Sequence, residues 1–192
     1  MKTVRICLRR NTDKIGRMKL NAKQLRITKP SEEELVKIER KPIYVVLDNV
    51  LDTYNIGSIF RLADAVAAKE LILCGGTEAP PSSRIHKAAV GTEEWVPWRY
   101  VPEASDEIKR LKSEGVKIVA VEQDERAIPV RELKVDLPVA IVVGHETEGV
   151  SRQALEMADV IVEIPMWGVN KSLNVHVSAA IVVYEILRAY GK

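Results

Sequence analysis

Short, continuous apolar runs recur along the chain from residue 42 onward, and segments with helical periodicity separate them. Consecutive apolar positions of this kind are typical of parallel strands that are buried on both faces. The helical segments are 55–68, 103–113 and 172–190, and the last of them is apolar almost all round its middle. Strands that alternate with helices predict an α/β fold, with an open, mostly parallel sheet covered by helices on both faces. The predicted strands are 43–47, 71–73, 116–121, 139–143 and 160–162.

Capping residues predict where several helices begin and end. Ser31, with Glu34 three residues later, matches a capping box for a short helix that runs to about Arg40. Gly115 is suited to end the helix over 103–113, and Ser172 is suited to cap the last helix. The pattern changes at Pro42, so we expect a basic N-terminal extension over 1–41 and one folded domain over 42–192.

The composition favours an ordinary globular protein. The chain has 192 residues, enough for one well-buried domain and a short extension. No apolar run reaches the roughly 18 residues that a membrane span needs, and the charged N-terminus does not resemble a secretory signal. Cys7 and Cys74 are the only cysteines, and no residues with zinc-ligand spacing lie near them. We therefore expect no disulfide framework, no metal site, no membrane association and a cytoplasmic location.

The charge is unevenly distributed. Residues 1–30 contain ten basic residues and one acidic residue, whereas residues 31–192 have a net charge of −7. A solvated tail would explain this segment, and so would an arm that binds a polyanion such as RNA. If the arm contacted six phosphates, log K would fall with log[salt] with a slope of about −4 to −5.

Three polar loops follow predicted strands, where open parallel sheets bind their ligands. The first, 47–61, leads into a helix near Asn55, with Gly57 in the first turn leaving room for another backbone or a ligand. The second, 144–151, places two carboxylates between two glycines, and the third, 164–178, precedes the last helix. Taken singly, each loop is also consistent with a capped helix or an acidic turn.

Together these loops resemble the three signature motifs of the SpoU (TrmH-like) branch of the SPOUT methyltransferases. The family patterns are Asn-x-Gly followed by Arg, then Gly-x-Glu-x-x-Gly, then Ile-Pro-Met-x-Gly followed by Ser-Leu-Asn-Val. The stretch 87–98 is also similar to the family's middle segment, and the resemblance covers about 42–190. The matching residues are Asn55, Gly57 and Arg61; Gly144, Glu146 and Gly149; Ile164 to Met166 with Gly168; and Ser172 to Val175.

The resemblance implies a fold, a cofactor and an assembly. Family members form an α/β sheet whose C-terminal part threads a trefoil knot, and they are homodimers with the site near the subunit interface. The over-apolar helix 172–190 agrees with a helix that faces a second subunit. The knot loops hold S-adenosylmethionine, mostly through backbone groups, and this similarity implies the following cofactor-binding positions: Val121, Gly144, Ile164, Ser172 and Leu173.

The resemblance also implies transfer of a methyl group to a ribose 2′-hydroxyl of RNA. The family's proposed base corresponds to Arg61, although a guanidinium with a pKa above about 12 is poorly suited to take a proton. We expect Arg61 to hold a phosphate and the developing oxyanion instead, with proton transfer left open. Asn55, Glu146, Ser172 and Asn174 would orient Arg61 and the ribose. A short basic arm, in place of an extra globular N-terminal domain, favours tRNA over rRNA.

Some residues depart from the family pattern or have no assigned role. His176 stands where a small residue is usual, and His145 falls inside the second motif. We interpret both histidines as packed or solvent-facing residues. Trp95, Trp98 and Trp167 could stack on a base, but we favour packing roles for them.

Two other functions are consistent with part of this pattern. A nucleotide-binding dehydrogenase would have a similar sheet, but no Gly-x-Gly-x-x-Gly follows the first strand. A non-catalytic RNA-binding module could have the same fold, but the intact Arg61, Glu146 and Asn174 argue against it.

Overall fold

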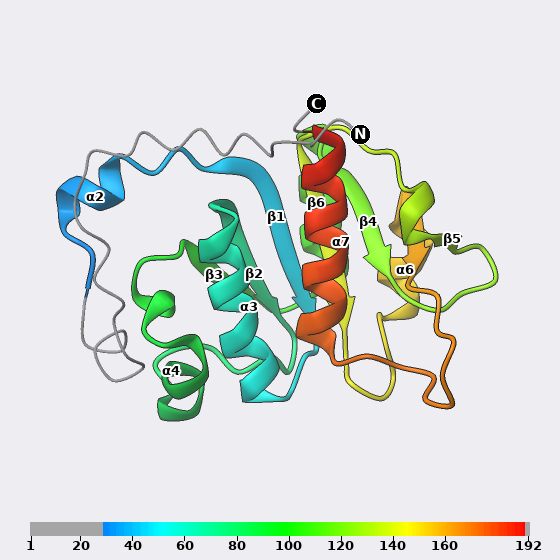
Figure 1. The fold of residues 1–192 in the computed structure, drawn as a ribbon, viewed down its shortest axis with the longest axis horizontal. Coiled ribbons are helices and arrows are strands. Elements are labelled where there is room, and N and C mark those ends of the chain that lie inside the picture. The colour runs from blue at the N-terminus through cyan, green and yellow to red at the C-terminus, as the bar shows by residue number, and fades with distance from the viewer. Residues whose placement is uncertain (1–28, 191–192) are drawn as a thin grey trace, which may run out of the picture.

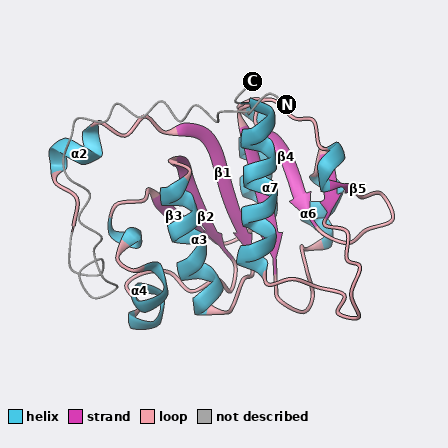
Figure 2. Ribbon diagram, in the orientation of Figure 1, coloured by secondary structure: helices cyan, strands magenta, loops and turns pink. Residues whose placement is uncertain are grey.

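The computed structural model describes residues 29–190, and within them seven strands form one sheet with helices on both faces (Figures 1 and 2). The strand order is β3-β2-β1-β6-β4-β7-β5, and every neighbouring pair is parallel. The predicted open α/β sheet is therefore confirmed. In chain order the elements are α2 (Glu32–Val36), β1 (Lys41–Asp48), α3 (Thr53–Ala65), β2 (Ala68–Cys74), α4 (Ser83–Ala89), η1 (Thr92–Glu94), β3 (Trp98–Val101), α5 (Ala104–Ser113), β4 (Lys117–Val121), β5 (Ile128–Pro129), η2 (Val130–Glu132), β6 (Val139–Gly144), α6 (Arg152–Met157), β7 (Val160–Glu163) and α7 (Val175–Tyr190).

Two hydrophobic cores lie on the two faces of the sheet. Alternate side chains of β1 enter different cores, because successive residues of a strand point to opposite faces. Ile43 and Leu47 pack with residues of α3 and α7, and Tyr44 and Val46 pack with residues of α5 and α6. In Figure 1, α3 and α7 lie in front of the strands. Burial on both sides explains why β1 and β6 are apolar at consecutive positions.

The predicted strands and helices are present, with shifted ends, and several short elements were not predicted. The five apolar runs correspond to β1, β2, β4, β6 and β7. The edge strands β3 and β5 were missed because neither has a buried apolar run; β3 is only partly buried and β5 has two residues. The seven-residue α4 was also missed, as it is too short to show helical periodicity. Gly115, with a φ of +79°, directly follows the C-cap residue Glu114 of α5, so the helix ends close to the predicted position.

Gly57 lies where α3 and α4 are in close contact. A Cβ atom at Gly57 would lie 2.5 Å from Ala88 Cβ and 2.7 Å from the Ile85 carbonyl oxygen. The space that the sequence analysis assigned to a backbone or a ligand is therefore filled by the backbone of α4. Glycine is required here because any larger side chain would push the two helices apart.

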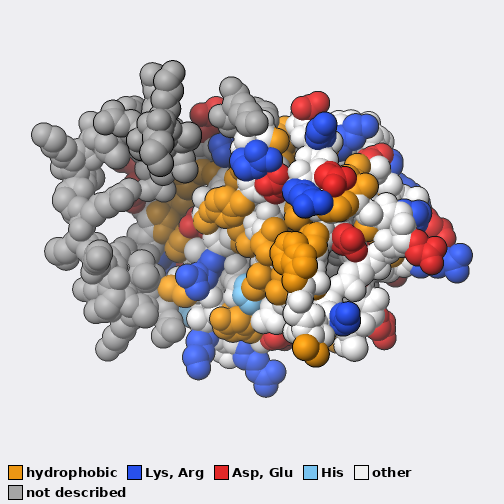
Figure 3. All heavy atoms as spheres, turned by 45° about the vertical axis from the view of Figure 1, so that its right-hand side comes forward, with side chains coloured by type: hydrophobic (Ala, Val, Ile, Leu, Met, Phe, Trp, Pro, Cys, Tyr) orange, Lys and Arg blue, Asp and Glu red, His pale blue; other side chains and the backbone are white. Residues whose placement is uncertain are grey.

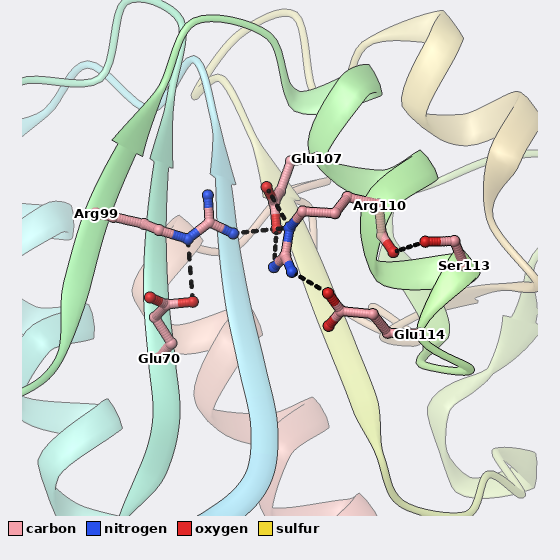
Figure 4. Close-up of polar contacts among 6 residues, drawn as sticks. All are labelled: Glu70, Arg99, Glu107, Arg110, Ser113 and Glu114. Carbon is pink, nitrogen blue, oxygen red and sulfur yellow. Dashed lines mark hydrogen bonds and ion pairs between the residues drawn. The ribbon is translucent and has the colours of Figure 1, made fainter.

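An ion-pair network holds the β2–β3 edge of the sheet against α5 (Figure 4). Glu107 of α5 is buried and accepts hydrogen bonds from Arg99 of β3 and Arg110 of its own helix. Arg99 also donates to Glu70 of β2 at 3.2 Å, and Arg110 pairs with Glu114. Burial works to raise the pKa of Glu107, but its hydrogen bonds to Arg110 and Arg99 outweigh burial and keep that pKa below its usual value.

The segment before β1 partly follows the prediction. Ser31 and Glu34 form the expected capping box, but α2 ends at Val36 rather than near Arg40. Arg40 instead donates to the backbone carbonyls of Ala68 and Trp95, which ties the connecting segment to the domain. Residues 1–28, which carry nine of the ten N-terminal basic residues and Cys7, lie outside the described residues. The domain boundary at residue 42 stays a prediction.

Two further points concern the chain as a whole. Among residues 29–190 there is no helix with both the length and the apolar character that a bilayer span requires. Cys74 is buried in the sheet, and burial raises the pKa of its thiol to about 12. The trefoil knot stays a prediction.

Candidate functional site

A cavity of about 270 Å³ opens at the carboxyl ends of β4, β6 and β7. The strand arrowheads in Figure 1 point toward this edge, where Figure 2 shows long loops. Such an edge is where open α/β sheets bind ligands, and the volume is close to the lower end of the range for small-molecule sites. The lining residues are Val121, Glu122, Gln123, Val143, Gly144, His145, Glu146, Thr147, Gly149, Val162, Glu163, Ile164, Met166, Lys171, Ser172, Leu173, Val175 and Ser178.

Two of the three predicted loops form the walls of this cavity. All five residues that the resemblance assigned to cofactor binding line it: Val121, Gly144, Ile164, Ser172 and Leu173. Gly144 is tightly enclosed, since a Cβ atom there would lie 2.2 Å from the backbone carbon and oxygen of Gly149. The second motif therefore needs glycine at 144 to let its own loop fold back on the strand end.

Glu146 joins the second loop to the first. Its carboxylate accepts hydrogen bonds from the backbone N–H groups of Leu51 at 3.1 Å and Asp52 at 3.0 Å, and from the Asn55 amide at 2.9 Å. Burial works to raise the pKa of Glu146, but the bonds from Asn55, Leu51 and Asp52 outweigh it and keep the pKa below its usual value. The carboxylate therefore stays ionised while it holds the start of α3 beside the cavity.

Asn55 also contacts the third loop region, through His176 of α7. The Asn55 side chain is buried, and its Oδ1 lies 2.8 Å from His176 Nδ1. Because the Asn55 amide nitrogen donates to Glu146, Oδ1 must accept, so His176 carries its proton on Nδ1. The ring of Tyr54 meets the His176 ring edge-on at 5.5 Å between centroids. One hydrogen-bond chain, Glu146–Asn55–His176, thus connects all three loops.

His176 was predicted to be packed or solvent-facing, and its ring is indeed partly buried and packed against Tyr54. Its hydrogen bond to Asn55 was not predicted. Burial lowers the pKa of His176, although the nearby Asp52 carboxylate works in the opposite direction. The ring is therefore neutral at pH 7. Its position two residues after Asn174, inside the third motif, was the available signal.

Arg61 lies on α3, six residues after Asn55, and its side chain is exposed. Within residues 29–190 it forms no hydrogen bond or ion pair, unlike Arg99 and Arg110, and it does not line the cavity. An exposed guanidinium without a partner retains all five of its N–H donors for a ligand.

Ser172 and Asn174 are both exposed, and only Ser172 lines the cavity. The prediction that Ser172 caps the last helix is wrong, because α7 begins at Val175. The backbone carbonyl of Asn174 accepts the first bonds, from Val177 at 2.9 Å and Ser178 at 3.0 Å. Ser172 lies in the preceding loop, where its carbonyl accepts from the Asn170 amide at 3.0 Å.

Glu122 and Gln123 also line the cavity, and the sequence analysis did not single them out. Glu122 accepts from the Val150 backbone N–H at 2.8 Å, and Gln123 donates to the Lys171 carbonyl. They connect the end of β4 to the second and third loops. Their position directly after β4 was the available signal, since β4 is a central strand whose carboxyl end faces the cavity.

The remaining histidine and the tryptophans have different environments. His145 Nδ1 accepts from the backbone N–H groups of Thr147 and Glu148, so its ring stabilises its own loop. Trp98 packs edge-on against Phe60, and Trp95 donates to Asp64 at 2.7 Å, which confirms packing roles for both. Trp167 is 90% exposed, so the packing role predicted for it is wrong.

The fold and the cavity define a class: an α/β protein with an all-parallel sheet that binds a small ligand at the carboxyl ends of its central strands. Residues 42–184 match the family described as the SpoU rRNA Methylase family. The chain belongs to this family.

Relatives with assigned activities are similar over most of the chain. A tRNA (guanosine(18)-2′-O)-methyltransferase from Thermus thermophilus is 33% identical over 156 residues, covering 81% of this chain and 79% of the relative. A 23S rRNA (guanosine-2′-O-)-methyltransferase from Ralstonia nicotianae is 32% identical over 177 residues, covering 92% and 71%.

Solved structures agree with this assignment. The A. aeolicus TrmH/SpoU tRNA modifying enzyme has a TM-score of 0.74 and 30% identity, covering 88% of this chain and 82% of that one. An AdoMet-bound rRNA methyltransferase from Sinorhizobium meliloti has a TM-score of 0.72 and 30% identity, covering 79% and 57%. The family predicted from the three motifs is confirmed.

Proposed function

We propose that this chain is an S-adenosylmethionine-dependent RNA methyltransferase that methylates a ribose 2′-hydroxyl. The observation that carries the proposal is the hydrogen-bond chain Glu146–Asn55–His176, which brings the first loop to the edge of a cavity walled by the other two. The similar T. thermophilus and R. nicotianae proteins, both named as RNA 2′-O-methyltransferases, support the same activity.

The cavity has the features expected of a site for S-adenosylmethionine. Val121, Gly144, Ile164, Ser172 and Leu173 would hold it, mostly through backbone groups. Because Gly144 has no side chain, the backbone is exposed to the cavity at this position. The carboxylates of Glu122, Glu146 and Glu163 also line the cavity, and their negative charge favours a ligand with cationic groups. Bound there, the cofactor would supply an electrophilic methyl group on a positively charged sulfur.

Arg61 is the side chain best suited to hold the RNA. Its guanidinium, which has no partner within residues 29–190, can donate two parallel hydrogen bonds to a phosphate, and it can stabilise negative charge that develops on the ribose oxygen. The ribose oxygen would take the methyl group that the bound cofactor supplies, its hydroxyl proton would pass to solvent water, and Arg61 would stabilise the negative charge on the oxygen. Arg61 would therefore act as a clamp for phosphate and oxyanion.

The other predicted catalytic residues would position the reacting groups. Glu146 and Asn55 fix the first turn of α3, and Arg61 lies further along the same helix. Ser172 and Asn174 are exposed at the entrance to α7, where their side chains are available to the ribose. Positioning of this kind supplies much of the rate enhancement in group transfer.

We infer that the substrate is tRNA, with rRNA as the alternative. The basic segment 1–30 favours a polyanion, and relatives named for each RNA class are similar to this chain. An RNA substrate implies a cytoplasmic location.

We also infer a homodimer formed through α7. Ile181 and Tyr184 of this apolar helix remain 36% and 55% exposed. On the face shown in Figure 3, hydrophobic side chains gather near the middle and charged ones surround them. An exposed apolar patch on a helix that already packs against the sheet is typical of a subunit interface.

The decisive experiment incubates the purified protein with methyl-labelled S-adenosylmethionine and either total tRNA or ribosomal RNA, and maps ribose methylation by mass spectrometry. Label in tRNA at a 2′-oxygen is the expected result, and label only in rRNA would select the alternative substrate. Binding of RNA without any methyl transfer would overturn the proposed activity in favour of a non-catalytic RNA-binding module.

A further inference from the structure

A second cavity, of about 540 Å³, lies between α4 and η1 and shares no lining residue with the cofactor cavity. The polar groups at this cavity are concentrated in His86 of α4 and in Glu93 and Glu94 of η1. Its lining residues are Pro80, Pro81, Ser82, Ser83, His86, Glu93, Glu94 and Trp98.

The three side chains converge on one point. One ligand atom from each of His86, Glu93 and Glu94 lies within 4.8 Å of the other two. His86 Nδ1 and Glu93 Oε1 are 2.5 Å apart. Two ligands on one tetrahedral zinc ion, each at about 2.1 Å from the metal, are separated by about 3.4 Å. Small side-chain rotations would therefore bring all three atoms to coordination distance.

Glu93 has an unpaired oxygen at this point. Its side chain is only 8% exposed, and its buried Oε2 has no hydrogen-bond partner among the described residues. Buried carboxylate oxygens are normally hydrogen-bonded or bound to a cation, because leaving one unsatisfied is costly. A protonated His86 would pair with Oε1 alone and would leave Oε2 unsatisfied.

The local charge also favours a cation. Glu93 and Glu94 contribute two negative charges, and Lys29, paired with Glu94, balances only one of them. The Lys29 side chain is 67% exposed, so it can leave Glu94 without burying an uncompensated charge.

We propose that His86, Glu93 and Glu94 form a binding site for a divalent transition-metal cation, with zinc as the best match. Zinc binds both imidazole nitrogen and carboxylate oxygen, whereas Mg²⁺ and Ca²⁺ bind oxygen ligands almost exclusively. The open cavity provides water for the fourth position. The bound ion would fasten η1 to α4. The absence of a metal site was predicted from the cysteine spacings alone, and only the fold brings these three residues together.

The test is calorimetric titration of the full-length protein with ZnCl₂, in a Cys7→Ser background that removes the one thiol outside the described residues. Cys74 needs no change, because burial raises its pKa to about 12 and keeps it a thiol. We expect one ion per chain with a micromolar or tighter Kd. Glu93→Gln keeps the shape of the side chain but removes its negative charge, and it should weaken binding at least tenfold.

His145→Gln is the matched control, since it removes an imidazole outside the cluster, and its Kd for zinc should equal that of the parent. The melting temperature gives a second measure: free zinc at about 100 times Kd should raise Tm by roughly 5–10 °C in the parent and much less in Glu93→Gln. His86→Gln serves as the second variant if Glu93→Gln does not fold. Equal zinc binding by parent and cluster variants, no binding by the parent, or equal affinity for Mg²⁺ would each overturn the proposal.

Discussion

Two carboxylates on opposite sides of the sheet are held in contrasting ways. Glu107, on α5, is buried and accepts hydrogen bonds from two guanidinium groups, as Figure 4 shows. Glu146 lies at the cofactor cavity and is held by two backbone N–H groups and the Asn55 amide, with no cation among its hydrogen-bond donors within residues 29–190. In both, hydrogen bonds outweigh burial, so the pKa stays below its usual value.

The difference distinguishes a structural carboxylate from a positioning one. Around Glu107 both arginine charges are paired with carboxylates of the protein, so this network is suited to stabilise the fold. Around Glu146 all the hydrogen-bond donors are neutral, and Arg61, further along α3, remains without a partner among the described residues. Changes at the first network should therefore affect stability, and changes at the second should affect activity.

The largest effect is expected for Arg61→Ala. Loss of the phosphate and oxyanion clamp should lower kcat by about 10²–10³-fold, while the Kd for S-adenosylmethionine changes less than about twofold. Methyl transfer and calorimetry measure the two quantities. Arg152→Ala, which removes an exposed arginine that pairs only with Glu156 among the described residues, is the control and should keep full activity. Full activity in Arg61→Ala would remove Arg61 from the mechanism.

Glu107→Gln should give the largest loss of stability. It leaves Arg99 and Arg110 without their shared carboxylate, which we expect to cost about 2 kcal/mol of unfolding free energy. This is below the usual cost for a fully buried pair because these arginines are 32% and 42% exposed. Urea denaturation measures it. Unchanged stability would mean that the network contributes nothing to the fold.

Glu146→Gln should show the opposite pattern. The amide oxygen of glutamine can still accept hydrogen bonds, but the amide NH₂ group would face one of the three donors that now bind the carboxylate. We expect about a 10- to 100-fold loss of kcat with less than about 1 kcal/mol change in unfolding free energy. A loss of stability as large as that of Glu107→Gln, with activity intact, would reverse the assignment of the two carboxylates.

A smaller effect is expected from the pair His176→Ala and His176→Asn. Alanine removes the donor to Asn55 Oδ1, and we expect about a fivefold loss of kcat. Asparagine carries an N–H donor at the position of Nδ1, so it should restore most of that activity. Equal activity of both variants would show that the hydrogen bond to Asn55 does not position the site.

The smallest effect concerns pH and His176. Its folded pKa lies below the unfolded value of 6.5, so below pH 6.5 the unfolded state binds more protons than the folded state. Stability should therefore fall as pH decreases from 6.5 toward the folded pKa. Between about pH 7 and pH 5.5, His176→Asn should lose less unfolding free energy than the parent, by under about 1 kcal/mol. Parallel stability curves would contradict the lowered pKa.

Much of the fold was predictable, because buried strands such as β1 and β6 are apolar at consecutive positions regardless of their neighbours. The edge strand β3 was not, since Arg99 is partly buried only through its ion pairs with distant residues. Similarly, the motifs identified Asn55 and Glu146 but not the bond between them, which depends on how β1 and β6 lie side by side.

The capping error at Ser172 has a similar origin. Serine is a good capping residue in isolation, but the loop 164–174 extends further before the chain turns into α7. Likewise, His176 gained its role from Asn55, a partner 121 positions away that no local pattern could reveal.

The close packing of Gly57 against α4 restricts the movement of α3. Asn55 and Arg61 stand on either side of this contact along α3, and the backbone of α4 leaves α3 no room to rotate or slide toward it. Glu146 holds the start of α3, and α4 packs against the helix one turn further on. We therefore expect a displacement of α4 to move Arg61, the proposed RNA clamp, so changes over 80–94 should alter methyl transfer.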